Sequence, residues 1–456
     1  MHYWRKHMKL NLHKDTVKDV LKLSLPAVGE MILYTIIWVV DTMMVGHYGG
    51  NIAVSSVGLS TEFLSTYSNV LVGSGISVGI TSIVARYVGA NKIEKAEEYA
   101  TIGFFVAIIL AILGGLFFAS LSYPLLVAVG ADNTVAHIGA SYMHIASIAI
   151  FFTMLINSLS ATLRAYGNTK TPLFTAIVVN IINIVLDYGL IFGKLGLPQL
   201  GAVGSAIATS TAQFLGFIFI AFYFMKHSKI KLHFKYIKNL RLDRLKSLLH
   251  LSIPAMLQEG SYSISRLICN IFIVALGTIA FSANQITTTI ESISFMPGWG
   301  FAVAATTLVG QKVGEKNYKK AKEYAKTSLF LGTITMVIFS VLFLFIPGPI
   351  FKLFISSNET EVIKLGTYCL MVAAIEQPFL ALSMISGGIL KGSGDTKTPF
   401  KVTLFTSWVI RFPLMFVAIF TFKLSVVYVW IITAIQWAID GSLLCFLYKK
   451  KFSKLN

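Results

Sequence analysis

Residues Leu163–Pro172 read LRAYGNTKTP, and nearly the same ten residues return as LKGSGDTKTP at Leu390–Pro399. Three further pairs of short segments match in the same order, each at a spacing of about 225–228 residues. These pairs are Leu25-Pro26-Ala27 with Ile253-Pro254-Ala255, Val88-Gly89-Ala90 with Val313-Gly314-Glu315, and Lys95–Ala100 with Lys320–Ala325. Four ordered matches indicate that one structural unit occurs twice along the chain.

The composition is that of a membrane protein. Of the 456 residues, 55% are hydrophobic and only 13% are charged, and the mean hydropathy is +0.73. These values exclude an ordinary soluble multi-domain enzyme. Twelve apolar runs are each long enough for a helix that crosses about 30 Å of hydrocarbon. The runs lie at about 18–45, 52–80, 95–121, 135–160, 171–193, 201–225, 247–275, 279–308, 321–346, 362–388, 400–421 and 425–447.

Twelve runs and one repeat predict an all-α polytopic membrane protein with two pseudo-symmetric lobes of six transmembrane helices. Because six is even, both lobes should have the same orientation, and parallel repeats of this kind place a pathway between the lobes. We expect a cytoplasmic N-terminus (1–17), an N-lobe (18–225), a basic cytoplasmic linker (226–246), a C-lobe (247–447) and a cytoplasmic C-terminus (448–456).

The net charge of +18 is best explained by membrane topology. In a soluble protein it would suggest nucleic acid, but here the basic residues lie between apolar runs, where they set orientation and contact anionic lipid headgroups. Basic clusters follow the even-numbered runs, whereas the alternate loops hold only scattered lysines. We therefore expect a multi-pass protein of the plasma membrane with both termini in the cytoplasm. Cys269, Cys369 and Cys445 lack paired spacing, which favours packing over a disulfide or metal site.

Two carboxylates lie deep in the predicted N-lobe. Asp41 interrupts the first apolar run. Placing an ionisable group inside the membrane costs a few kcal/mol, so we expect Asp41 to have a structural or functional role. In the fifth run, Asn180, Asn183 and Asp187 fall at i, i+3 and i+7, which places them on one helical stripe. Two such polar faces could enclose a small cation or share a proton. The alternative is that both carboxylates only hydrogen-bond neighbouring helices together.

The carboxylates are not duplicated in the second copy of the repeat. Asp41 corresponds to a position near Cys269, and Asp187 to a position near Pro413–Leu414. A purely architectural pair would be expected twice, so the N-lobe is predicted to be specialised. On the first helix, Tyr34 and Trp38 share the stripe of Asp41, and together with Asn180 they are candidates for the substrate cavity. The sequence does not rank the C-lobe candidates Glu259, Arg266, Glu291, Glu376 and Arg411.

The residues that carry these arguments resemble the multidrug and toxic compound extrusion (MATE) family over essentially the whole chain, about 18–447. The resemblance rests on the Pro26…Asp41 spacing and on VDTMMVG (Val40–Gly46), NIINIVLDYGLIFG (Asn180–Gly193), GAVGSAIAT (Gly201–Thr209) and the duplicated ten-residue motif. It implies a V-shaped, monomeric twelve-helix transporter that exports small organic, often cationic or aromatic, compounds in exchange for Na⁺ or H⁺.

The resemblance also implies a cation site made by Asp41, Asn183, Asp187 and Thr209, and no cofactor other than the coupling ion. Na⁺, if it is that ion, would bind to these four residues. Some members have an essential Glu in the seventh helix, eight residues after its proline, where this chain has Tyr262. Glu376 is about one turn away from the acid that some members use in the tenth helix. These departures favour the N-lobe site.

Two other classes remain open. A lipid-linked oligosaccharide flippase of the same superfamily would share the architecture, but it should have a strongly cationic cavity, and here the intramembrane charges are mixed. A membrane-embedded transferase is disfavoured because the outer loops are short and no His/Asp or Ser/His cluster converges. The chain also lacks a P-loop and an HExxH motif, so we expect a transporter and not an enzyme.

Overall fold

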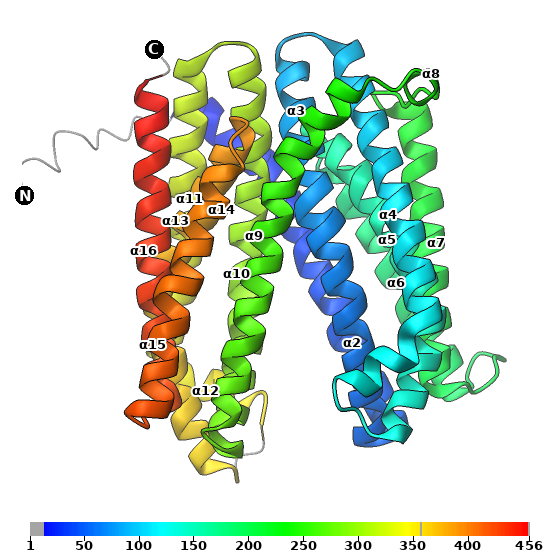
Figure 1. The fold of residues 1–456 in the computed structure, drawn as a ribbon, viewed down its shortest axis with the longest axis vertical. Coiled ribbons are helices and arrows are strands. Elements are labelled where there is room, and N and C mark those ends of the chain that lie inside the picture. Colours follow the sequence, from blue (N-terminus) through cyan, green and yellow to red (C-terminus); the bar gives the residue numbers. More distant parts are fainter. Residues whose placement is uncertain (1–12, 356–357, 455–456) are drawn as a thin grey trace, which may run out of the picture.

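The computed structural model describes residues 13–355 and 358–454, without the side chains of Trp38 and Asn51. The described chain is all α-helical, with short π-helical turns (Figure 1). The first half contains α2 (Lys14–Ser68), η1 (Asn69–Ile76), α3 (Ser77–Gly89), α4 (Ile93–Ala128), α5 (Asn133–Ala165), α6 (Lys170–Phe192) and α7 (Gly201–His227). The short α8 (Lys235–Lys238) follows and lies in the basic segment between the two halves.

The second half repeats this pattern. It contains α9 (Leu242–Val274), α10 (Thr278–Gly314), α11 (Tyr318–Phe345), α12 (Pro347–Lys352), α13 (Thr360–Gly392), α14 (Lys397–Phe405), η2 (Thr406–Arg411), α15 (Phe412–Phe416), η3 (Val417–Thr421) and α16 (Val426–Ser453). Helix α9 begins at Leu242, inside the segment 226–246 that the sequence assigns to the linker.

Helix α2 contains two membrane-spanning segments. Gly50 breaks the helical backbone with φ 58° and ψ −151°, a conformation that glycine adopts without steric cost. Eleven helical segments among the described residues are long and apolar enough to span a membrane, including 14–50 and 52–89 on either side of this break. Of the twelve predicted spans, only α9 is not among these eleven. It has 33 residues but is less apolar, since it carries Gln258, Glu259 and Arg266 along its middle.

The two halves form two bundles that lie close together at one end of the molecule and diverge toward the other (Figure 1). The described chain begins and ends at the end where the bundles are close, which also carries α8. The prediction of an all-α polytopic protein whose two lobes form a V is therefore confirmed.

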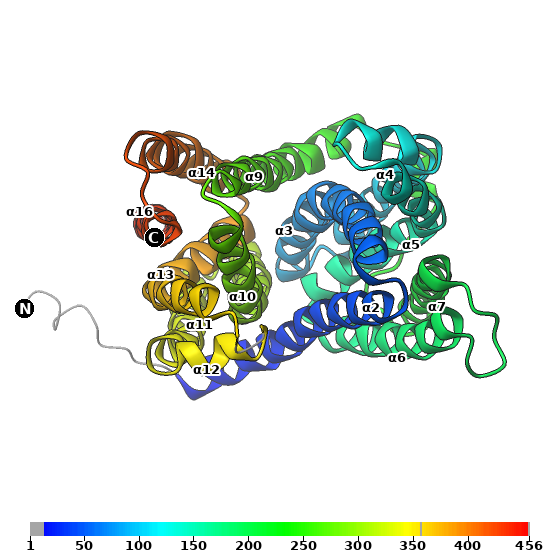
Figure 2. The same cartoon turned by 90° about the horizontal axis from the view of Figure 1, so that it is seen from below.

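The start of each lobe's first helix packs in the core of the other lobe. Val20 and Leu23 of α2 are buried in a core cluster made otherwise of C-lobe side chains. Leu248 and Leu251 of α9, both 228 residues further along, are buried in the N-lobe cluster. Figure 2 shows α2 and α9 running along opposite sides of the molecule, each reaching from one bundle to the other. These helices therefore couple the lobes mechanically.

The repeated ten-residue motif forms the same local structure in both lobes. The side chain of Asn168 accepts a hydrogen bond from the backbone N–H of Thr171 at 3.1 Å, and Asp395 accepts one from Thr398 at 3.0 Å. Each acceptor satisfies a backbone donor that the first turn of α6 or α14 leaves without a helical partner. The motif therefore starts the fifth helix of each lobe.

Hydrogen bonds across the lobe interface follow the same symmetry. Thr307 of α10 donates to the carbonyl of Arg164 in α5 at 3.1 Å, and Ser82 of α3 donates to the carbonyl of Lys391 in α13 at 2.5 Å. Ser82 and Thr307 are repeat equivalents, as are Arg164 and Lys391. Residues near the closed end of the bundles thus form a pseudo-twofold interface.

Candidate functional site

The two N-lobe carboxylates face each other. Asp41 comes from α2 and Asp187 from α6, and their carboxyl groups interact directly. Asp187 is fully buried and Asp41 is half-buried. Among the described residues, no side chain donates a hydrogen bond to either carboxylate oxygen of Asp187 or to Oδ1 of Asp41. The pair thus lacks the hydrogen bonds that usually satisfy buried carboxylates.

Two further predicted residues lie in the same cluster. Asn183 is fully buried one turn before Asp187, and its amide donates to the hydroxyl of Thr209 in α7 at 3.2 Å. Both side chains also lie against Asp41. The carbonyl oxygen of Asn183 accepts no hydrogen bond from the described residues. The structure therefore brings together all four side chains assigned to the cation site, from three helices.

Two side chains that sequence reasoning missed complete the cluster. Tyr142 of α5 is buried and lies near both carboxylates, and Ser205 of α7 lies beside Asp187 and Tyr142. Ser205 precedes Thr209 by four residues, so it lies on the same face of α7, and this spacing could have identified it. Tyr142 has no such signal, because its neighbours at helical spacing, Ile138, Gly139, Ile145 and Ala146, are not polar.

Two of the three candidates for the substrate cavity, Tyr34 and Asn180, do not join the carboxylate pair. Tyr34 lies beside the buried ion pair of Glu30 and Arg164. Asn180 is buried, and its amide donates to the carbonyl of Ala176 in its own helix at 2.8 Å. Each is seven residues from its carboxylate, about 10 Å along a helix. The side chain of Trp38 lies outside the described residues.

The acids of the C-lobe have partners of a different kind. Glu376 is fully buried and lies against Glu291 and Arg411. Glu259 of α9 accepts a hydrogen bond from Ser74 of the N-lobe at 3.3 Å, and Lys391 also lies near it. A basic side chain therefore lies near each of these three glutamates.

The N-lobe pair has no such cation, since the described residues form no salt bridge with Asp41 or Asp187 (every described ion pair lies elsewhere). The described residues also contain no group of three or more His, Cys, Asp or Glu side chains suited to a metal ion. The cluster instead offers carboxylate, amide and hydroxyl oxygens, which are ligands for hard cations or acceptors for a proton.

Known proteins resemble this chain over most of its length. It is 28% identical over 415 residues to the probable multidrug resistance protein NorM of Thermotoga maritima, covering 91% of this chain and 88% of that protein. It is 27% identical to the probable NorM of Synechocystis, covering 92% of both. A solved structure described as the outward-facing conformation of a multidrug resistance MATE family transporter has the same fold, with a TM-score of 0.89, 20% identity and 97% coverage of each chain.

The family model accounts for the internal repeat. The MatE model matches the chain twice, at residues 26–189 and 254–417. The two matches begin at the prolines of the repeated segments, Pro26 and Pro254, and together they cover well over half of the 456 residues. The chain therefore belongs to the MatE family, whose members are membrane transporters and not enzymes.

Proposed function

We propose that this protein is a secondary antiporter that exports small organic compounds, cationic or aromatic in character, in exchange for H⁺ or Na⁺. The coupling ion binds at Asp41, Asn183, Asp187 and Thr209. The observation that carries the proposal is the pairing of Asp41 with Asp187 in a buried site that has no basic side chain among its described neighbours. The multidrug resistance names of the relatives support export of drugs as the class of transport.

Electrostatics supports ion coupling at this pair. Two carboxylates in contact in a region of low dielectric cannot both remain ionised without a counter-charge. The counter-charge must come from solution, as a proton shared by the two groups or as a Na⁺ ion held by them and by the oxygens of Asn183 and Thr209. Buried carboxylates with a purely structural role would instead be expected to accept hydrogen bonds from other side chains of the protein, as Asp440 does.

Ion binding at the pair would act on the lobes through α2. The pair draws Asp41 of α2 against Asp187 of α6, while Val20 and Leu23 at the start of α2 are anchored in the core of the other lobe. A change in the position of α2 at Asp41 is thus transmitted to the interface between lobes. This provides a route by which cation binding displaces the exported compound, and by linkage the compound and the cation disfavour each other.

The remaining expectations belong to the same proposal. The protein acts as a monomer in the plasma membrane, in contact with lipids, and the end at which the bundles meet is cytoplasmic because it carries the basic loops. In this orientation the bundles diverge toward the outside.

Transport in proteoliposomes tests the proposal. A pH gradient and a Na⁺ gradient are imposed separately, and the movement of ethidium is followed by fluorescence. We expect one gradient to drive transport, and expect Asp41→Asn and Asp187→Asn each to abolish the response. Asp440→Asn is the matched control, because Asp440 is fully buried in the C-lobe but accepts hydrogen bonds from Ser383 at 2.6 Å and Thr406 at 2.8 Å. This control should retain the response.

Two results would contradict the proposal. Full gradient-driven transport in both N-lobe variants would remove the carboxylate pair from the coupling mechanism. No response of the folded wild-type protein to either gradient would instead favour the flippase, and the same proteoliposomes would then be tested with lipid-linked oligosaccharides.

A further inference from the structure

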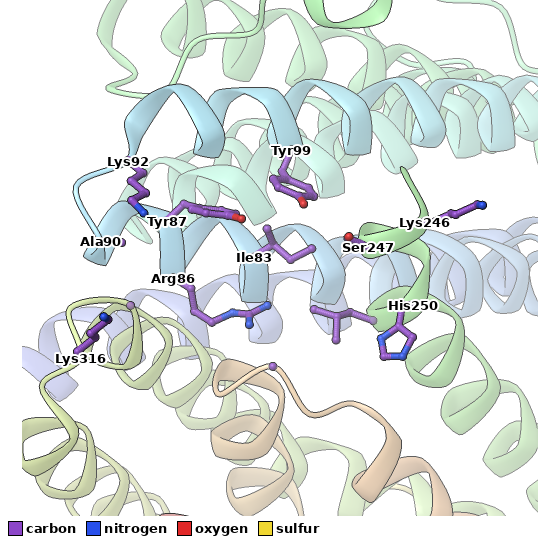
Figure 3. Close-up of a pocket in the computed structure, with 13 residues that line it drawn as sticks. Ile83, Arg86, Tyr87, Ala90, Lys92, Tyr99, Lys246, Ser247, His250 and Lys316 are labelled. Atoms are coloured by element: carbon purple, nitrogen blue, oxygen red, sulfur yellow. The ribbon is translucent and has the colours of Figure 1, made fainter. Parts of the chain in front are cut away.

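A pocket of about 730 Å³ lies where the two lobes meet, at the end that carries the chain termini (Figure 3). The N-lobe contributes Arg86 and Lys92, the start of α9 contributes Lys246 and His250, and the turn after α10 contributes Lys316. The pocket lining contains no acidic residue. None of its lining residues belongs to the carboxylate cluster, and the pocket plays no part in the proposed coupling mechanism.

Arg86 is placed at the centre of this pocket. Its Nε donates to the carbonyl of Ser82 in its own helix at 3.0 Å, and its two terminal nitrogens make no hydrogen bond to the described residues. In Figure 3 the guanidinium lies between Lys316 and Lys92 on one side and His250 on the other, while Lys246 extends outward at the far edge. The guanidinium therefore presents unused donors to the pocket.

The backbone opposite Arg86 is shaped to admit this side chain. Gly394 has φ +84°, and a Cβ on Gly394 would clash with Nη1 of Arg86. The backbone conformation at position 394 favours glycine, and the missing Cβ leaves room for the guanidinium that lies over it. The arrangement holds a cation between the lobes without neutralising it.

The repeat shows that this charge is not needed for packing. The equivalent of Arg86 in the second lobe is Gln311, whose neutral amide donates to the carbonyl of Ala165 at 2.9 Å. Lys92 corresponds to Asn317, and Lys316 to Asn91. Three of the five basic positions of the lining are therefore neutral on the other side of the pseudo-twofold axis, whereas Lys246 and His250 correspond to Lys18 and Lys22.

Three acids are next to lining residues in the sequence, and all three are already paired with other cations. Glu98 lies 3.5 Å from Arg244, Glu315 lies 2.8 Å from Lys312, and Asp395, next to Gly394, lies 3.4 Å from Lys451. Among the described residues, no salt bridge joins a carboxylate to any of the five basic side chains of the lining. The pocket has an uncompensated positive charge that an anion would neutralise.

We propose that this pocket binds a phosphate-bearing anion, which bridges the two lobes. The guanidinium fork of Arg86 fits two oxygens of one phosphate, and lysines from both lobes favour a group that carries more than one negative charge. The stacked rings of Tyr87 and Tyr99, with centroids 5.4 Å apart, form the wall beside Arg86. Such a ligand binds only when the lobes are together at this end, so it stabilises that conformation.

The phosphate can come from a lipid headgroup or from solution, and two probes distinguish these sources. Purified full-length protein in detergent is titrated calorimetrically with inorganic pyrophosphate. In parallel, the protein is placed in phosphatidylcholine nanodiscs with or without phosphatidic acid, and the phosphatidic acid retained after extraction is quantified by mass spectrometry.

The variants exchange each cation for its repeat equivalent: Arg86→Gln, Lys92→Asn and Lys316→Asn. We expect each to weaken binding of the active probe about tenfold, and substitutions from both lobes must act if the ligand bridges them. The control is Lys397→Gln, an exposed lysine outside the lining. If Arg86→Gln does not fold, the double variant Lys92→Asn/Lys316→Asn is tested in its place. Binding of neither probe, or binding that the variants leave unchanged, would overturn the proposal.

Discussion

Gly89 and Gly314, which are 225 residues apart, make reciprocal contacts across the lobe interface. A Cβ on Gly89 would collide with the backbone of Gln311, and a Cβ on Gly314 would collide with the backbone of Arg86. Gln311 precedes Gly314 by three residues, as Arg86 precedes Gly89. The ends of α3 and α10 therefore cross at a pseudo-twofold axis, at a separation that only glycine allows.

Alanine at either of these glycines should separate the lobes at this end. We expect Gly89→Ala and Gly314→Ala each to destabilise the interface by about 1–3 kcal/mol, the usual cost of overpacking, because the colliding atoms belong to the backbone and cannot rotate away. Thermal unfolding in detergent measures the effect. Gly58→Ala is the matched control, since a Cβ there would meet no atom within 4 Å. Equal melting temperatures for all three variants would contradict the role assigned to the crossing.

The buried ion pair of Glu30 and Arg164 joins α2 to α5 at 2.8 Å. Glu30→Gln should cost about 3–5 kcal/mol of stability, because it leaves the Arg164 guanidinium buried without a counter-charge. The double variant Glu30→Met/Arg164→Met should be more stable than either single Met variant, since it removes both charges. Melting temperatures of the wild type, of Glu30→Gln, of the two single Met variants and of the double variant give the comparison. A double variant that loses the sum of the single effects would show that the two charges act independently.

The sequence predicted the helices and the carboxylate cluster because both leave periodic signals. Asp41, Asn183 and Asp187 are polar residues in apolar runs, and their spacing assigns each to one face of a helix. The exchange of α2 and α9 between the lobes left no such signal, because Val20 and Leu248 are apolar wherever they pack. Tyr142 was missed for a related reason: only the tertiary structure places α5 against both carboxylates.

Thr209 can distinguish the two candidate coupling ions. A Na⁺ ion would use the hydroxyl oxygen of Thr209 as a ligand, whereas a proton shared by Asp41 and Asp187 would not. We expect Thr209→Ala to raise the Na⁺ concentration for half-maximal transport about tenfold, equivalent to about 1.4 kcal/mol, if Na⁺ is the ion. Transport driven by a pH gradient should be nearly unchanged if it is H⁺.

The control for Thr209 is Thr211→Ala, two residues along α7. The hydroxyl of Thr211 donates to the carbonyl of Ile207 in its own helix at 2.8 Å, so its loss should leave either gradient response intact. If Thr209→Ala and Thr211→Ala lower transport equally under both gradients, the effect is structural and Thr209 is not a ligand.

The hydrogen bonds of Ser82 and Thr307 should hold the lobes together. Each hydroxyl donates to a backbone carbonyl of the opposite lobe, Ser82 to Lys391 and Thr307 to Arg164, and each such bond contributes about 0.5–1.5 kcal/mol. Ala85 is fully buried beside Gly310 of the opposite lobe, so a cysteine at position 85 reports opening of the interface. We expect its reaction with a thiol reagent to become about tenfold faster in Ser82→Ala/Thr307→Val.

This measurement needs a background in which Cys269, Cys369 and Cys445 are replaced by alanine. Thr335→Val is the matched control, because the hydroxyl of Thr335 donates to the carbonyl of Leu331 within α11 at 2.9 Å and joins no other helix. If the interface opens as a unit, Ser82→Ala and Thr307→Val should each accelerate labelling by a similar factor. Acceleration by only one of them would mean that the pseudo-twofold interface does not open symmetrically, and that the other hydrogen bond persists while the lobes separate.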